Sequence, residues 1–250
     1  MPHEARDALF RDAVAAIDLG DQISLERQLR EHPELVRDRL EAPGAWLRDK
    51  IGNVEGFFEK TYLLWFVAED PVRNGRLPNN IAQIARAIVD AARRQSVESL
   101  PEQLDHALRL VSWSWIAAKC GVQNALIDVL VDAGASPHGK PDDALVNQHL
   151  AAAAHLVERG ATLTLATALC LERWDDVDRL VPTASAKERQ FAFILAALNG
   201  KAEALRRMLD HGIELNSPSS SLYSHAIAVH HAVCSGSLDA VKVLVDVMKL

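Results

Sequence analysis

The chain has 250 residues, and 27 Lys and Arg against 34 Asp and Glu give a formal net charge of -7. This acidic balance argues against a protein that wraps nucleic acid, because such proteins need a clustered basic face. Apolar residues make up 49% of the chain and aromatics 5%, which excludes disordered and collagen-like classes. The composition favours helices packed through small residues over a β-sandwich.

The N-terminal residues and the cysteines point to a cytoplasmic protein. Residues 1–7 are too charged for a signal peptide, and the apolar runs are too short to cross a bilayer. Cys120, Cys170 and Cys234 lie far apart and form no CxxC pair, so neither a disulfide framework nor a zinc ribbon is indicated. We expect no cofactor and no contact with a membrane.

Pairs of short apolar stretches, each ended by a turn signal, recur along the chain. In the second stretch of a pair, the apolar residues fall at i, i+3 and i+4, which places them on one face of a helix. Glycines 121, 200 and 236 stand where the chain leaves the first helix and needs a positive φ. The expected helical segments, in chain order, are 10–19, 25–29, 62–68, 81–92, 104–120, 127–135, 142–148, 153–161, 165–171, 193–200, 203–212, 229–236 and 239–245.

Three segments do not follow this pattern. Residues 38–60 contain three glycines, which predict a loop with Phe57 and Phe58 packed beneath it. Residues 71–80 form a loop with two prolines and one glycine, and residues 92–103 separate two of the helical stretches.

The repeated unit resembles the ankyrin repeat, whose pattern is TPLHxAAxxG followed by VxxLLxxGA. The best match to the first half is residues 229–236, with His230 at the histidine of the motif, and residues 127–135 and 153–161 match the second half. No copy has an intact Thr-Pro. The alternative is another solenoid of helical pairs, of the HEAT or TPR kind.

The resemblance implies an all-α, ankyrin-like solenoid of about seven stacked helical hairpins with short, degenerate fingers. It further implies a single domain over 1–250, with insertions near 38–60, 71–80 and 92–103. Within this stack, four second helices are expected to share one inward-facing site, occupied by Leu130, Leu156, Leu209 and Leu244.

Neither a metal site nor a nucleophilic cysteine is expected. The sequence contains no phosphate-binding loop, GxSxG, HExxH or EF-hand pattern. His230 and Cys234 have the i, i+4 spacing of metal ligands, and His225 and His231 lie close by. However, the resemblance gives His230 a structural role, in which it bonds the backbone of the neighbouring finger. The three cysteines are expected to be packing residues.

The tryptophans divide into expected core residues and one exposed candidate. Trp65 and Trp115 fall at the histidine position of the motif, so we expect both in the core. Trp113 stands two residues before Trp115, so the two cannot share one helix face, and the more exposed one is a candidate binding hot spot.

The resemblance implies a non-catalytic module that binds another protein through its concave surface. The family's contact sites are the last turn of each first helix and the finger that precedes it. Transferred residue by residue, these sites are Asp18, Leu19, Lys119, Cys120, Leu171, Leu198, Asn199 and Ser235 in the helices and Arg189, Gln190, Tyr223 and His225 in the fingers; we add Trp113 as the exposed aromatic.

Two other functions stay open on sequence grounds. An enzyme or small-ligand binder could use residues 38–60 as a lid, and would show a deep pocket with charged groups beside Trp46. An assembly subunit would instead show a large self-complementary apolar face.

The C-terminal repeat lacks the family's closing Gly-Ala, which is replaced by Met248-Lys249. Because a solenoid needs a polar cap on its last hairpin, we expect that this chain belongs to a longer array or that its end packs on another molecule, including a second copy of itself. The residues expected to face that neighbour are Val229, Val233, Val243 and Val247.

Overall fold

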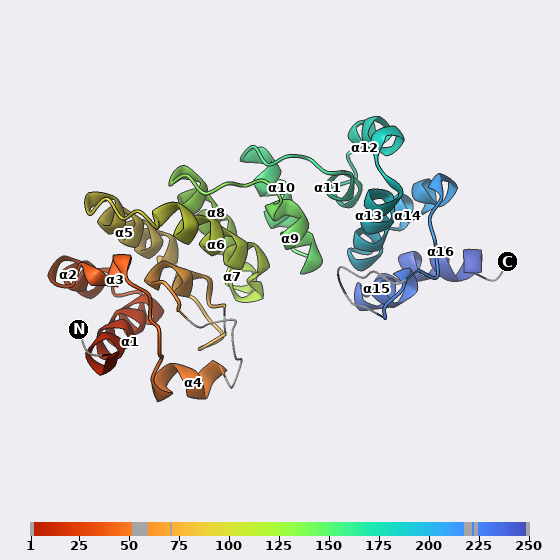
Figure 1. Cartoon of the computed structure of the whole chain (residues 1–250). Helices are drawn as coiled ribbons and strands as arrows, with labels where there is room; N and C mark the ends of the chain where they lie inside the picture. The colour runs from red at the N-terminus through yellow and green to blue at the C-terminus, as the bar shows by residue number, and fades with distance from the viewer. Residues whose placement is uncertain (1–2, 52–59, 71, 218–221, 223–224, 249–250) are drawn as a thin grey trace. The chain divides into compact units, whose positions relative to one another are not determined.

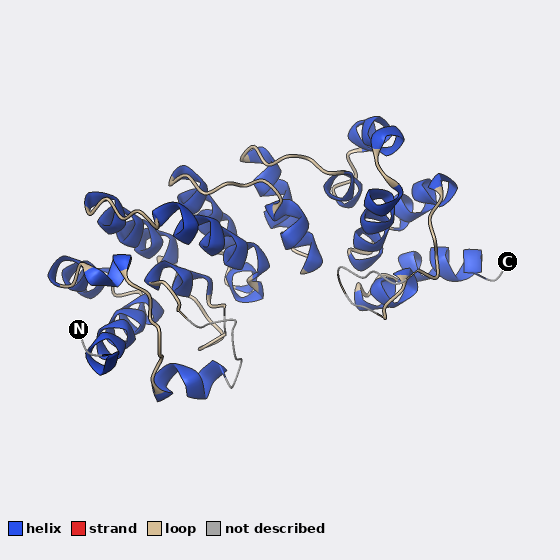
Figure 2. Cartoon of the chain, viewed as in Figure 1, coloured by secondary structure: helices blue, strands red, loops and turns tan. Residues whose placement is uncertain are grey.

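The computed structural model describes residues 3–51, 60–70, 72–217, 222 and 225–248. Helices and turns account for nearly all of this part, and the backbone pairing within it is confined to an isolated bridge between Leu40 and Thr61 (Figure 2). The fold class is therefore all-α, as predicted. Contacts separate the chain into two compact units, Met1–Ser136 and Pro137–Leu250. The grouping of both into a single domain stays a prediction.

The described residues of the first unit include three helical hairpins (Figure 1). They are α1 with α2, the 3₁₀ helix η1 with α5, and α6 with α8. The second helices of these pairs lie side by side, since α5 packs on both α2 and α8. The elements are α1 (His3–Leu19), α2 (Gln22–Glu31), α3 (Glu34–Arg37), α4 (Ala45–Ile51), η1 (Leu63–Ala68), α5 (Ile81–Arg94), α6 (Leu100–Trp113), α7 (Trp115–Lys119) and α8 (Gln123–Asp132).

The segments expected to be insertions contain more helix than the sequence indicated. Within 38–60, α4 follows Gly44, and residues 52–59, including Phe57 and Phe58, lie outside the described residues. Residues 92–103 lie mostly in α5 and α6. The helix expected over 104–120 is instead divided at Ser114, whose hydroxyl accepts a hydrogen bond from the backbone N–H of Ala117 and so caps α7.

In the described part of the second unit, the helices pair as hairpins: α9 with α10, α11 with α12, α13 with α14, and α15 with α16 (Figure 1). The first helices pack on one another in the order α9, α11, α13 and α15, and α14 packs on α16. The elements are α9 (Lys140–Val146), α10 (Leu150–Glu158), α11 (Leu165–Cys170), α12 (Trp174–Leu180), η2 (Val181–Thr183), α13 (Ala186–Leu198), α14 (Ala202–Met208), η3 (Leu209–His211), α15 (Ala228–Cys234) and α16 (Leu238–Met248).

Small residues set the close spacing of these helices. Ala192, Ala196 and Ala197 of α13 are fully buried, which lets its neighbours approach its backbone. After α13, Gly200 has a φ of +67°, and a Cβ atom at this position would lie 2.8 Å from the Cβ of Ser237. Glycine is therefore required there on two grounds, the backbone conformation and the contact with the next hairpin.

The inward site of the second helices is confirmed at three positions and wrong at one. Leu130, Leu156 and Leu244 are fully buried, whereas Leu209, the first residue of η3, is only partly buried and the preceding Met208 is fully buried. Aligning Leu205 with the first apolar residue of VxxLL places Met208, not Leu209, at the first leucine. The predicted register was one residue late in this repeat.

The C-terminal hairpin also departs in part from expectation. Val233 is 63% exposed, and Val229 and Val247 are partly exposed, so these three side chains are accessible. Val243 is buried, because it lies on the face of α16 that packs against the preceding hairpins. No helix in the described part of the chain combines the length and the apolar character needed to span a bilayer.

Candidate partner-binding face

In the first unit, the chain's own loop 72–80 contacts the C-terminal ends of α1 and α7. The carboxylate of Asp18 accepts hydrogen bonds from the Arg73 guanidinium at 2.8 Å and from the Asn74 side chain at 2.6 Å. The backbone N–H of Leu77 donates to the Cys120 sulfur at 3.4 Å. Asp18 and Cys120 were expected to contact a partner, but in this structure they hold the loop in place.

A buried carboxylate fixes the start of this loop. Glu69 is fully buried with a φ of +52°, and its Oε1 accepts hydrogen bonds from the backbone N–H groups of Arg73 (2.9 Å), Asn74 and Gly75 (3.0 Å). Its Oε2 pairs with the Arg73 guanidinium at 2.9 Å, and this guanidinium also lies over the Phe66 ring. The loop is therefore built into the core of the first unit.

Two large apolar or aromatic side chains, Leu19 and Trp115, are exposed in this region. Leu19 is 75% exposed, and Trp115 is 53% exposed with the Lys119 ammonium 5.8 Å from its ring centroid. The expectation that Trp115 lies in the core is wrong, because Ser114 starts a new helix and turns this side chain outward; Trp113 is the partly buried one. Trp65 is also only partly buried.

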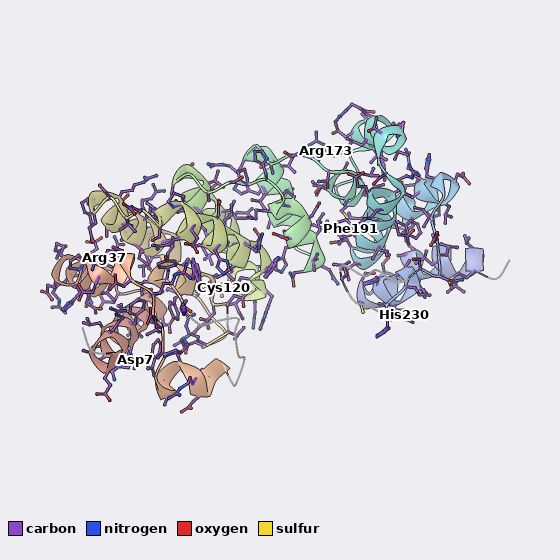
Figure 3. The ribbon with its side chains drawn as sticks, in the orientation of Figure 1. Asp7, Arg37, Cys120, Arg173, Phe191 and His230 are labelled. Carbon is purple, nitrogen blue, oxygen red and sulfur yellow. The ribbon has the colours of Figure 1, made fainter. Side chains whose placement is uncertain are left out.

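Trp46 holds the start of α4 in place through contacts with the rest of the first unit. Its indole N–H donates to the Asp7 carboxylate at 2.7 Å, and the same oxygen accepts from the backbone N–H of Gly44 at 2.7 Å. The Trp46 ring packs near Phe66, with centroids 6.3 Å apart. Asp7 on α1 (Figure 3) thus anchors the start of α4 to the first hairpin.

In the second unit, most of the predicted helix-end residues serve the stack itself. Leu198 is buried, and the Asn199 side chain donates to the backbone carbonyl of Leu145 at 3.0 Å. The Ser235 hydroxyl donates to the carbonyl of Ala232 at 2.6 Å. Leu171, at the end of α11, is partly exposed.

The finger residues also include both side chains that stabilise the stack and side chains that are exposed. The Arg189 guanidinium donates to the carbonyl of Ala184 at 2.6 Å. Gln190 exchanges two 3.0 Å hydrogen bonds with the backbone of Glu214 and so joins α13 to the following finger. His225 is exposed, and Tyr223 lies outside the described residues.

The histidine pair is arranged differently from the expectation. His230 projects from α15 (Figure 3), is exposed, and accepts a hydrogen bond from the backbone N–H of Ile227 at 3.1 Å, so it caps its own helix. His231 is the buried member, and burial lowers its pKa. Among the described residues, no three His, Cys, Asp or Glu side chains are grouped to hold a metal.

The cysteines differ in their environments. Cys170 is fully buried, and burial raises the pKa of its thiol. Cys120 is partly buried and Cys234 is exposed, so the expectation of a packing residue fails at Cys234.

A cavity of about 340 Å³ opens within the second unit, where α11 and α13 begin. Its residues are Asp142, Thr162, Leu163, Thr164, Leu165, Ala166, Leu180, Thr183, Ala184, Glu188 and Phe191. The sequence does not indicate this site, because Asp142 comes from one repeat and Phe191 from a repeat further along the chain (Figure 3 shows Phe191 on α13). The only local signal was a pair of acidic residues, Asp142-Asp143, at the start of a short helix.

Part of the second unit matches the model of a known protein family. Residues 149–249 match the family model described as "Ankyrin repeats (3 copies)". The match covers three of the hairpins described above, α11 with α12, α13 with α14, and α15 with α16. No curated protein matches the chain. The repeat pattern, the stacked hairpins and the family match agree that residues 149–249 of this chain contain ankyrin repeats.

Proposed function

We propose that the chain is a non-catalytic module that binds another protein through the first-helix and finger face of its second unit. The observation that carries this proposal is the match of residues 149–249 to ankyrin repeats, because repeats of this family are generally protein-interaction modules. A stack of hairpins also offers an extended and rigid surface, which suits a protein partner.

Exposure and internal bonding decide which of the expected residues are the best contact candidates. We propose Leu171 and His225 as contacts, because the His225 side chain is exposed and the Leu171 side chain is partly exposed. Leu198, Asn199, Arg189, Gln190 and Ser235 are proposed to act indirectly, by fixing the helix ends and fingers from which contacts are made.

The first unit also contains candidate contact residues, fewer than those of the second unit. Leu19 and the pair Trp115 and Lys119 are accessible, and Trp113 is partly so, whereas Asp18 is engaged by the loop 72–80. Exposed aromatic residues are enriched in binding hot spots. We therefore expect Trp115 to contribute more than Trp113, the residue favoured by the sequence.

The remaining parts of the proposal are a cytoplasmic location, and a partner other than nucleic acid or membrane. The net charge of -7 supports the exclusion of nucleic acid as a partner. The environment of Cys170 supports a non-catalytic role for this thiol, because a buried thiol with a raised pKa is a poor nucleophile.

Affinity capture with matched variants tests the proposal. The immobilised full chain is compared with Leu171→Glu and His225→Glu on the proposed face, and with Arg206→Glu as a control on the exposed side of α14. We expect one set of proteins to be retained by the wild type and the control and lost by both face variants. Retention by all four chains, or loss only from the control, would reject this face as the binding surface.

Self-association through the last hairpin is a separate proposal. Val233 and Leu238 are 63% and 65% exposed, and Met248 is 40% exposed. A buried apolar side chain of this size is worth about 1.5–3 kcal/mol. Covering these side chains with a second copy would therefore be favourable.

A further inference from the structure

The cavity at the start of α11 and α13 combines two acidic side chains with apolar walls, and it lies in the unit for which partner binding is proposed. Its lining residues include Thr162, in the loop before α11, and Glu188, in the first turn of α13. Its volume of about 340 Å³ lies near the lower end of the range for ligand pockets. It can therefore admit one side chain of a partner more readily than a large cofactor.

Asp142 is oriented by two threonines. The hydroxyls of Thr164 and Thr167 both donate to the same carboxylate oxygen, Oδ1, at 2.8 and 2.7 Å. The other oxygen, Oδ2, has no polar partner among the described residues. Thr164 is itself fixed, because its hydroxyl accepts the backbone N–H of Thr167 and caps α11. The carboxylate is thus held in one orientation, with one oxygen left for a ligand.

The charged side chains that line the cavity are both acidic. They are Asp142 and Glu188, and no lysine or arginine is among the described lining residues. Arg189, the neighbour of Glu188, directs its guanidinium to the carbonyl of Ala184. The partial burial of Asp142 disfavours its ionised form and raises its pKa. A cation that entered the cavity would relieve this cost, whereas an anion would be repelled.

The apolar walls suit the stem of a long basic side chain. Leu163 and Leu180 contribute aliphatic surface, and Phe191 contributes an aromatic ring. Lysine and arginine bury their methylene stems against such surfaces while the charged head makes hydrogen bonds. Arginine can in addition stack on an aromatic ring.

We propose that this cavity is an anchor pocket that receives a lysine or arginine side chain of the partner protein, with the charged head on Asp142 and the stem against Phe191 and its apolar neighbours. The proposal rests on the protein-binding function proposed above and specifies the chemistry of the partner. It commits to a basic side chain carried by a protein segment.

Titration followed by NMR tests the pocket without knowledge of the partner. The probes are N-acetyl-arginine methylamide and N-acetyl-lysine methylamide, with the norleucine and glutamate analogues as apolar and acidic comparisons, added to the isotope-labelled full chain. We expect the two basic probes to shift the amide signals of Thr164, Ala166 and Phe191. Shifts of equal size with norleucine, or none with either basic probe up to its solubility limit, would overturn the proposal.

A matched pair of variants tests the role of the carboxylate. Asp142→Asn keeps the shape and the acceptor for the threonine hydroxyls, and Asp178→Asn makes the same charge change at an exposed residue of α12. We expect the affinity for the arginine probe to fall at least about tenfold in Asp142→Asn and to stay unchanged in Asp178→Asn. The same spectra show whether each variant is folded. A folded Asp142→Asn chain with unchanged affinity would overturn the proposal.

The partner capture separates this inference from the broader function. If the captured proteins depend on Leu171 and His225 but bind the Asp142→Asn chain as well as the wild type, the binding face stands and the anchor pocket is wrong. If capture is indifferent to Leu171, His225 and Asp142 alike, the proposed binding face fails, and the pocket fails with it as a partner site.

Discussion

The structure places Met208, and not Leu209, at the inward site of its repeat, and truncating each of the two residues tests this register. Met208 is fully buried between its own hairpin and the next one, whereas Leu209 is only partly buried. Truncating Met208 to Ala removes buried apolar atoms and leaves a cavity, and such substitutions cost about 2–5 kcal/mol. Truncating Leu209 loses less burial, so we expect a cost of about 1 kcal/mol.

Urea unfolding followed by far-ultraviolet circular dichroism measures this difference. Leu156→Ala and Leu244→Ala serve as references, because both side chains are fully buried at the equivalent position of other repeats. We expect Met208→Ala to be destabilised like these two references, and Leu209→Ala to be clearly milder. If Leu209→Ala is as costly as Leu156→Ala while Met208→Ala is nearly neutral, the register derived from the structure is wrong.

Four further predictions concern the buried ion pair of Arg73 and Glu69, the titration of Asp142, the metal content and self-association. Arg73→Ala leaves the buried Glu69 carboxylate without its cation, so we expect urea unfolding to show a fall of about 3–5 kcal/mol in the free energy of unfolding. The control Arg76→Ala removes an exposed side chain and should cost about 0.5 kcal/mol or less. Equal costs for the two variants would contradict the importance of the buried pair. Burial raises the pKa of Asp142, so the folded state binds a proton at this carboxyl more tightly than the unfolded state does. The stability gained from this tighter proton binding is fully present below the ordinary Asp pKa of about 3.9, and it is lost as the pH rises through the raised pKa. The stability of Asp142→Asn relative to the wild type should therefore increase from about pH 3 to pH 7, and a flat or opposite trend in urea titrations would refute this. Protein purified without nickel should contain no stoichiometric zinc; zinc that is lost in a His230→Ala, Cys234→Ser double variant would show that a metal site was missed. Light scattering should give a mass above that of the monomer for the wild type and the monomer mass for Val233→Lys, and a wild type that stays monomeric at high concentration would exclude self-association through the last hairpin.

The hairpins could be predicted because their signals are local. In α8, α10 and α16 the apolar spacing determines which side chain is inward, and Leu130, Leu156 and Leu244 are buried as expected. In α14 the same spacing admits two registers, since Met208 and Leu209 are both apolar. Packing against the adjacent hairpins selects Met208, and a single sequence does not reveal that choice.

The contacts that shape the candidate site come from distant parts of the chain, which is why the sequence did not reveal them. Asp18 bonds to Arg73 across 55 residues of sequence, and Asp142 bonds to Thr167 across 25. Likewise, the exposure of Trp115 depends on the cap at Ser114, which divides what reads as one continuous helix. Such tertiary pairings follow from the stack, and no spacing rule along the chain encodes them.

Site-specific photo-crosslinking tests the central claim most directly. A photoreactive amino acid is placed in turn at Leu171 and His225 on the first-helix and finger face, and at Arg206 and Asp178 on the exposed surfaces of second helices. The captured partner is then irradiated in complex with each chain. The proposed binding face predicts crosslinks from Leu171 and His225 and none from Arg206 or Asp178. Crosslinks that come only from Arg206 and Asp178 would contradict it.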